Sequence, residues 1–124
     1  MRRVAVFDES SPIFQQLADR IADDVLAGTY AEEQQVASTN EFAAFYRINP
    51  ATAGKAMNLL VDRGVLYKRR GIGMFVAPGA RDLLVEQRRA RFAEQYVRPL
   101  VREAAALGID AAALTRMINQ EDPS

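Results

Sequence analysis

Apolar residues recur every four positions near the start of the chain, and polar residues separate them. The repeating residues are Ile13, Leu17, Ile21 and Val25. A four-residue repeat puts these side chains on one face of a helix. Pro12 suits the first helical turn, where its missing N–H costs nothing, and Gly28 is a typical stop. We expect a helix from about Pro12 to Ala27.

A second helix is predicted from a capping box. The Ser38 hydroxyl can accept from the backbone N–H of Glu41, and the Glu41 carboxylate can accept from that of Ser38. The helix should run to about Tyr46, anchored by Phe42, Ala43 and Phe45. The nine residues before it, 29–37, have no sustained period and are expected to form a loop in which Val36 enters the core.

A third helix should begin at Asn49, whose side chain can cap the first turn, with Pro50 in the first helical position and Gly64 as the stop. Its expected inward residues are Ala53, Ala56, Met57, Leu60 and Val61. Its polar face would carry Thr52, Lys55, Asn58 and Asp62. The short link Arg47-Ile48 makes the second and third helices a helix-turn-helix.

Two β-strands are predicted at residues 65–68 and 74–77, joined by a glycine-bearing turn that is rich in cations. A helix-turn-helix followed by a β-hairpin is the outline of a winged helix. The G-x-G in the turn is weak evidence for a phosphate-binding loop, because no helix follows it. The fold class is therefore mainly α with a small β-hairpin.

The last third of the chain should be helical. We expect a long helix over residues 80–107, bent near Gln95 or Tyr96 because Pro99 interrupts it. Gly108 should end this helix, and Asp110 should cap a final helix over residues 111–119, with Ala111, Leu114 and Ile118 facing inward. The predicted organisation is an arm (1–10) with a strand-like patch at residues 4–7, a winged helix-turn-helix domain (11–77), a two-helix appendage (80–119) and a tail (120–124).

Two helices that follow a complete small domain cannot easily bury their apolar residues alone. We expect them to pair with the same helices of a second copy, giving a homodimer. The dimerisation residues would be Phe92, Tyr96, Val97, Leu100, Val101, Leu107, Leu114 and Ile118. The alternative is that this pair folds back on its own domain.

Charge is unevenly distributed although the net charge is zero. Residues 44–91 hold ten basic and three acidic residues, whereas the flanking segments are net acidic. The basic excess thus coincides with the predicted helix-turn-helix and hairpin, as expected for a surface that binds nucleic acid. A chance asymmetry in a short chain is the alternative.

Several function classes are disfavoured by composition. The chain has no cysteine and no histidine, which excludes disulfides, thiolate metal sites and histidine-based catalysis. Asp23-Asp24 and Glu32-Glu33 are adjacent in sequence and form no evident acid/base pair, so we expect no enzyme, no metal and no cofactor. No apolar run is long enough for a membrane span or a signal peptide, and we expect a cytoplasmic protein. A winged-helix module that binds another protein is the remaining alternative.

Four segments together resemble the winged-helix domain of the GntR family of bacterial transcription regulators. They are Pro12-Ile13-Phe14-Gln15-Gln16-Leu17-Ala18-Asp19-Arg20-Ile21, Ser38-Thr39-Asn40-Glu41-Phe42-Ala43, Ile48-Asn49-Pro50-Ala51-Thr52-Ala53, and residues 60–77, which include Arg69-Arg70-Gly71-Ile72-Gly73. The short C-terminal part is similar to the two-helix appendage of the YtrA-like subgroup. The resemblance implies a homodimeric DNA-binding regulator, usually a repressor, that binds a palindromic operator of double-stranded DNA.

The family's contact positions can be carried over to this chain. An arginine that reads guanine is usual where Asn40 stands, and an asparagine pairs with adenine instead. The loop around residues 32–37 also lacks the family's usual prolines. The resulting candidate DNA-binding residues, taken with the basic residues above, are Ser38, Thr39, Asn40, Arg47, Asn49, Pro50, Ala51, Thr52, Lys55, Lys68, Arg69, Arg70 and Gly71.

A small-molecule effector is an open question at this level. A cavity between the winged-helix domain and the appendage, or at the dimer seam beside Phe92 and Tyr96, would suit an apolar ligand. Aromatic residues at helical spacing are, however, more often core packing.

Overall fold

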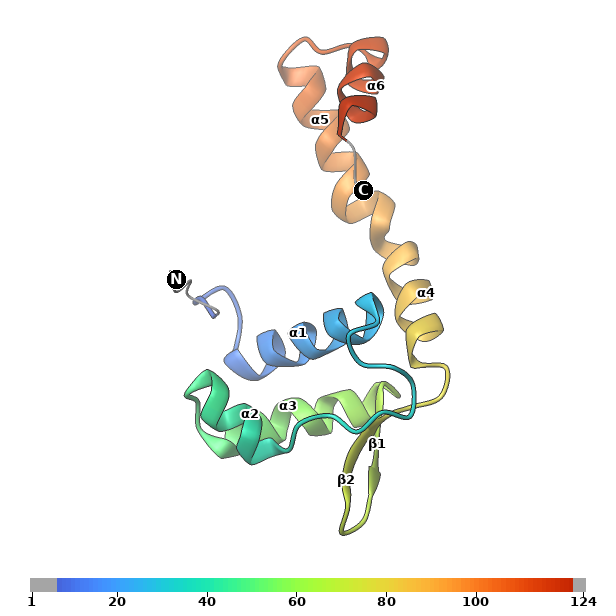
Figure 1. The fold of residues 1–124 in the computed structure, drawn as a ribbon. Helices are drawn as coiled ribbons and strands as arrows, with labels where there is room; N and C mark the ends of the chain where they lie inside the picture. The colour runs from blue at the N-terminus through green and yellow to red at the C-terminus, as the bar shows by residue number, and fades with distance from the viewer. Residues whose placement is uncertain (1–6, 122–124) are drawn as a thin grey trace. The chain divides into compact units, whose positions relative to one another are not determined.

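The computed structural model describes residues 7–121 and divides into two compact units, before and after the Glu86–Gln87 bond. Figure 1 shows a mainly helical chain with one two-stranded antiparallel hairpin, which confirms the predicted fold class. The N-terminal arm lies outside the described residues up to position 6, and so do residues 122–124 of the predicted tail. The predicted domain limits of 11–77 and 80–119 stay predictions.

Helix α1, Ile13–Ala27, has nearly the predicted extent, and Leu17, Ile21 and Val25 are buried as expected. Ile13 was also expected on the buried face, but it lies in the first turn and is 41% exposed, so that expectation was wrong. Pro12 precedes the first turn, and Gly28 ends the helix in a left-handed conformation with φ of 88°. The Gly28 N–H donates to the carbonyls of Asp24 and Val25, so the last turn is closed by the glycine that the sequence indicated.

Helices α2, Thr39–Tyr46, and α3, Pro50–Asp62, form the helix-turn-helix. Both hydrogen bonds of the capping box are present: Glu41 N–H donates to Ser38 Oγ over 3.1 Å, and Ser38 N–H donates to Glu41 Oε1 over 2.7 Å. Asn49 Oδ1 accepts from the backbone N–H of Ala51, and Pro50 opens α3 as predicted.

Strands β1, Leu66–Arg69, and β2, Gly73–Val76, form the hairpin, each one residue away from the predicted range. The register pairs Leu66 with Val76 and Arg69 with Gly73, so the pairing extends further toward the turn than expected. The shift reflects the turn itself, because the Ile72 N–H donates to the Arg69 carbonyl and closes a short loop.

Part of the predicted loop pairs with the hairpin. Val36 N–H donates to the Met74 carbonyl, Val76 N–H donates to the Gln34 carbonyl, and Gln35 forms an isolated antiparallel bridge with Phe75. Val36 is buried as predicted. The segment therefore pairs with the outer edge of β2 over a few residues, an arrangement that the hydrophobic period alone did not indicate.

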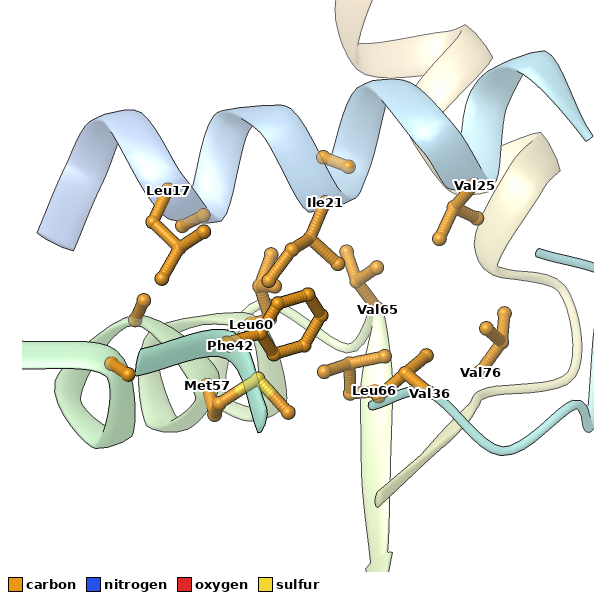
Figure 2. Close-up of a cluster of buried hydrophobic side chains, with 14 of the residues drawn as sticks. Leu17, Ile21, Val25, Val36, Phe42, Met57, Leu60, Val65, Leu66 and Val76 are labelled. Carbon is orange, nitrogen blue, oxygen red and sulfur yellow. The ribbon is translucent and has the colours of Figure 1, made fainter. Parts of the chain in front are cut away.

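The core of the N-terminal unit lies between α1, α3 and the base of the hairpin (Figure 2). In this view side chains of α1 point toward those of α3 and of the hairpin base. Its largest fully buried side chains are Leu17, Ile21, Val25, Met57, Leu60, Val65, Leu66 and Val76. Phe45, which was expected to anchor α2, is 74% exposed, so that expectation was wrong. Val61 is half-buried and packs against the core, on the inward side of α3 as predicted.

The first turns of helix α4, Ala80–Phe92, belong to the N-terminal unit. Ala80 and Leu84 are buried in its core, and Arg81 Nε donates to the Leu26 carbonyl at the end of α1 over 3.0 Å. The carbonyl of α1 that would otherwise lack a helical partner is thereby satisfied.

The predicted long helix is interrupted by a π-helical segment, η1, Ala93–Val97, which leads into α5, Arg98–Ala106. Pro99 explains the change, because it has no N–H to donate and its ring would collide with the carbonyl of Gln95. The Arg98 N–H donates to the Ala93 carbonyl five residues earlier, the spacing of a π-helix. At the predicted position, Gln95–Tyr96, the backbone hydrogen bonds thus change from α-helical to π-helical spacing.

The final helix, α6, spans Ala111–Gln120 and is capped by Asp110, whose Oδ1 accepts from Ala113 N–H over 2.8 Å. Ala104 of α5 is buried, but Leu114 is only half-buried. Ala111 and Ile118 are exposed, so the expectation that they face inward within the chain is wrong. One copy of this short helix pair offers too little surface to cover them.

Candidate nucleic-acid interface

The starts of α2 and α3 lie against each other. A Cβ placed on Gly54, in the second turn of α3, would be 3.7 Å from Cγ2 of Thr39, the first residue of α2. Thr39 and Thr52 are half-buried. The neighbouring Ser38, Asn40, Asn49, Pro50 and Ala51 are exposed. The structure therefore places these seven predicted contact residues on two adjoining helix starts.

Capping occupies some of the polar atoms in this group. Ser38 Oγ and Asn49 Oδ1 both accept backbone N–H groups, which leaves the Asn49 amide nitrogen as its outward donor. Within residues 7–121 no hydrogen bond involves the Asn40 side chain, which is exposed. Asn40 thus has a complete amide, two donors and one acceptor oxygen, to offer to a base edge.

Two predicted cations flank the helix starts. Arg47 occupies the link between α2 and α3 in a left-handed conformation with φ of 58°, and its side chain is exposed. Lys55 is exposed on α3, and its Nζ lies 4.3 Å from the ring centroid of Phe14 in α1. This contact limits where the ammonium group can point while leaving it accessible to a phosphate.

The hairpin tip carries the remaining predicted cations. Gly71, with φ of 76°, supplies the left-handed residue of the turn beside the exposed Arg70. Strand alternation separates the other two cations. Lys68 shares its hairpin face with the buried Leu66, whereas Arg69 shares the opposite face with Phe75 and lies 5.0 Å above its ring. Lys68 and Arg69 therefore lie on opposite faces of the hairpin.

Side chains of the preceding segment hold the hairpin. Gln35 Nε2 donates to the Ile72 carbonyl over 3.0 Å, and the Tyr67 hydroxyl donates to Glu33 Oε1 over 2.7 Å. That hydrogen bond to a carboxylate raises the pKa of Tyr67, so the hydroxyl stays a donor. Gln35 and Glu33 were not predicted as supports for the hairpin. Their pairing joins residues more than thirty positions apart, and no local pattern signals it.

The geometry of the N-terminal unit suits duplex DNA. Figure 1 shows α1 on one side of α3 and the hairpin extending away on the other. A helix that presents polar residues at its start can enter a major groove, and a basic hairpin beyond its end can follow the phosphate backbone. No group of three or more potential metal-ligating residues occurs in the described part of the chain. Nor does any helix there have the length and apolar character to cross a membrane.

The C-terminal unit exposes most of the residues predicted for dimerisation. Within a single chain, Leu114 is half-buried and the other seven are exposed: Phe92, Tyr96, Val97, Leu100, Val101, Leu107 and Ile118. Met117 is exposed as well and was not predicted. Large apolar side chains gathered in so short a segment mark a surface that is normally covered.

Comparison with known proteins connects this architecture to one family. The model of "Bacterial regulatory proteins, gntR family" matches residues 13–76, more than half of the chain. HTH-type transcriptional repressor YtrA of Bacillus subtilis is 27% identical over 111 residues, covering 90% of this chain and 85% of the relative. The similarity therefore includes residues of both units. Two other curated regulators match about half of this chain, which spans only 28% and 26% of their lengths.

Solved structures agree with this relation. A GntR family transcriptional regulator from Listeria monocytogenes is 26% identical, with a TM-score of 0.72 and coverage of 94% of this chain and 100% of the other. A crystal structure assigned to the GntR family from Bacteroides thetaiotaomicron is 36% identical, with a TM-score of 0.68 and coverage of 87% and 94%. The resemblance to YtrA-like regulators is confirmed, and the chain belongs to the gntR family of bacterial regulatory proteins, as a DNA-binding transcriptional regulator.

Proposed function

We propose that the protein is a homodimeric repressor that binds a palindromic operator in the bacterial cytoplasm, without enzymatic activity or a cofactor. The observation that carries the proposal is the adjoining, exposed starts of α2 and α3 in a unit that also bears a basic hairpin. The name of the B. subtilis relative, a transcriptional repressor, supports repression rather than activation.

Contacts divide between base edges and phosphates. In this proposal Asn40, Asn49 and Thr52 contact base edges in the major groove or the phosphates beside them, which the exposure of Asn40 and Asn49 supports. The backbone contacts fall to Lys55, Arg69 and Arg70, with Arg70 at the hairpin tip able to enter the minor groove. Asn40 favours adenine at its position, because an amide pairs bidentately with the adenine edge.

A dimer would present two such units to one face of the duplex. The exposed apolar residues of the C-terminal unit supply the surface for a twofold interface. Two reading helices then enter successive major grooves about 34 Å apart, which requires an inverted repeat with half-sites one turn apart.

Binding to the DNA upstream of the protein's own gene tests the proposal. Fluorescence anisotropy at several salt concentrations should give tight, saturable binding to one segment of that DNA and much weaker binding to random duplex. Asn40→Ala should weaken operator binding by about 1–3 kcal/mol and relax the preference at one base pair. Asn40 is the cleaner test residue, because Asn49→Ala would also remove the α3 cap.

Arg70→Ala is the counterpart of Asn40→Ala and tests contact with the phosphate backbone of DNA. It should weaken operator and random DNA alike and reduce the salt slope by roughly one. Arg70 is preferable to Arg69, whose guanidinium also covers the Phe75 ring. Equal losses on operator and random DNA for Asn40→Ala would contradict the assigned roles, and failure to bind duplex DNA at low salt would contradict the proposed function.

A further inference from the structure

The N-terminal unit contains a hollow of about 470 Å³ that the DNA-binding function does not use. It lies among α1, the segment that follows α1, and α2. Its lining residues are Asp24, Tyr30, Ala37, Glu41, Phe42, Phe45 and Tyr46. Two carboxylates and four aromatic rings thus share one concave surface, none of whose lining residues is basic. None of them belongs to the DNA-binding set, although Glu41 caps the same helix.

The aromatic rings present faces in two orientations. Phe45 and Tyr46 lie edge to face with centroids 4.8 Å apart and planes at 87°, and Phe42 and Tyr46 are nearly parallel at 6.4 Å. Phe45 is 74% exposed, so packing in the core does not account for an aromatic residue at this position. The electron-rich faces of such rings attract cations, most strongly where water is partly excluded.

The charges of both carboxylates affect the Tyr30 hydroxyl, which also lines the hollow. The pKa of the Tyr30 hydroxyl is raised first by its burial and then by the charge of Asp24, with a smaller contribution from Glu41. A phenol beside two carboxylates stays neutral, so it adds no positive charge of its own. The electrostatic character of the hollow is therefore negative.

We propose that this hollow is a binding site for a small organic cation, an alkylammonium or quaternary ammonium ion. The ammonium group would lie against Asp24 and Glu41, and its carbon substituents would contact the rings of Phe45 and Tyr46. The volume falls within the range of small-molecule sites, and aromatic walls with a few polar groups are typical of them. A hard metal ion fits poorly, because it prefers six or more oxygen ligands.

A neighbouring basic residue, Arg20, gives the proposal a second test. A smaller adjacent hollow of about 320 Å³ is lined by Arg20, Asp23, Asp24 and Tyr46, so the two hollows share Asp24 and Tyr46. Arg20 lines the smaller hollow together with Asp24, and its positive charge would oppose the binding of a cation nearby. Its removal should therefore strengthen ligand binding, while removal of the carboxylate should weaken it.

The test compares choline with its neutral isostere 3,3-dimethylbutan-1-ol, and includes tetramethylammonium and propylammonium as smaller cations. Each is titrated into the full chain by isothermal calorimetry and by amide chemical-shift mapping, without DNA. We expect saturable binding of at least one cation with dissociation constants of about 0.1–10 mM. The shifts should centre on Tyr30, Glu41, Phe45 and Tyr46, and the neutral alcohol should bind about tenfold more weakly.

Variants assign the binding to this hollow. Asp24→Asn and Phe45→Leu should each weaken cation binding about fivefold to thirtyfold. Arg20→Gln should tighten it severalfold, and Glu86→Gln, an exposed carboxylate outside the hollow, should leave it unchanged. Phe45→Leu replaces an exposed residue, so folding is preserved even where Asp24→Asn perturbs the end of α1.

Three results would overturn the proposal: no saturable binding of any cation up to ~50 mM, equal affinity for choline and the alcohol, or binding that Asp24→Asn and Phe45→Leu leave unchanged. Equal affinity for choline and the neutral alcohol would show that the hollow binds through apolar contacts alone and does not select for positive charge. Because the titration contains no DNA, its outcome is independent of the DNA-binding assays above.

Discussion

Two glycines near the candidate interface differ in whether the structure has room for a Cβ atom at their position. Gly73 begins β2 with φ of 148°, and a Cβ there would lie 2.5 Å from Nε2 of Gln35, the atom that donates to the Ile72 carbonyl. Gly54 lies within α3, and its Cβ would meet Thr39 at 3.7 Å, an ordinary contact. The first position therefore needs glycine, whereas the second only tolerates it.

Alanine substitutions should separate these cases. Gly73→Ala should lower the free energy of unfolding by about 1–3 kcal/mol, because it strains the backbone and displaces Gln35. Gly54→Ala should raise it by about 0.5–1 kcal/mol, because glycine weakens a helix interior. Urea denaturation without DNA measures both, and changes of the same sign would contradict the distinction.

At the scale of the element, the capping box of α2 should carry measurable stability. Ser38→Ala removes the acceptor for the Glu41 N–H and should lower the free energy of unfolding by about 1 kcal/mol. Ser11→Ala is the matched control, because no hydrogen bond of the Ser11 hydroxyl occurs in the described part of the chain. Thermal and urea melts of the two variants should differ, and equal stability would mean that solvent replaces the cap.

The elements that the sequence predicted well are those fixed by near neighbours. The caps at Ser38, Asn49 and Asp110 each depend on residues within three positions, so a local pattern is sufficient. Pro99 likewise predicted a disturbed helix, although its local effect does not distinguish a kink from a π-helical segment.

Elements that depend on distant partners were predicted less well. The strand limits shifted by one residue because the turn sets the hairpin register. The segment before α2 pairs with β2 through Gln35, which hydrophobic period cannot show. Phe45 has the spacing of a core residue but lies outside the core cluster, and only coordinates reveal the hollow that it borders.

At the scale of the whole molecule, the assembly is the property most open to test. Leu100→Glu places a charge among the exposed apolar residues of the C-terminal unit and should weaken self-association by about 30-fold or more. Operator affinity should fall with it, since each half-site is then bound separately. Sedimentation velocity measures the first effect and fluorescence anisotropy the second.

Gln120→Glu is the matched control, because it adds the same charge at an exposed polar position near the end of α6. It should leave both measurements unchanged. A wild-type chain that sediments as a monomer at micromolar concentration would contradict the dimer. The alternative in which the helix pair covers its own domain would then gain support.

The candidate interface was largely predictable, since its residues follow from two helix starts and a basic turn. Its internal arrangement was not, because the strand face that separates Lys68 from Arg69 depends on the pairing register. Which cations act together is thus a property of the folded hairpin, and a run of basic letters does not reveal it.

The way α4 begins has a consequence for dissecting this protein. Ala80 and Leu84 complete the core of the N-terminal unit, and Arg81 fastens the end of α1. A fragment cut directly after the hairpin would expose apolar core surface and leave the Leu26 carbonyl without its donor. We infer that an autonomous DNA-reading fragment has to extend through Glu86, so that fusions and swaps of the C-terminal part are best joined beyond that residue.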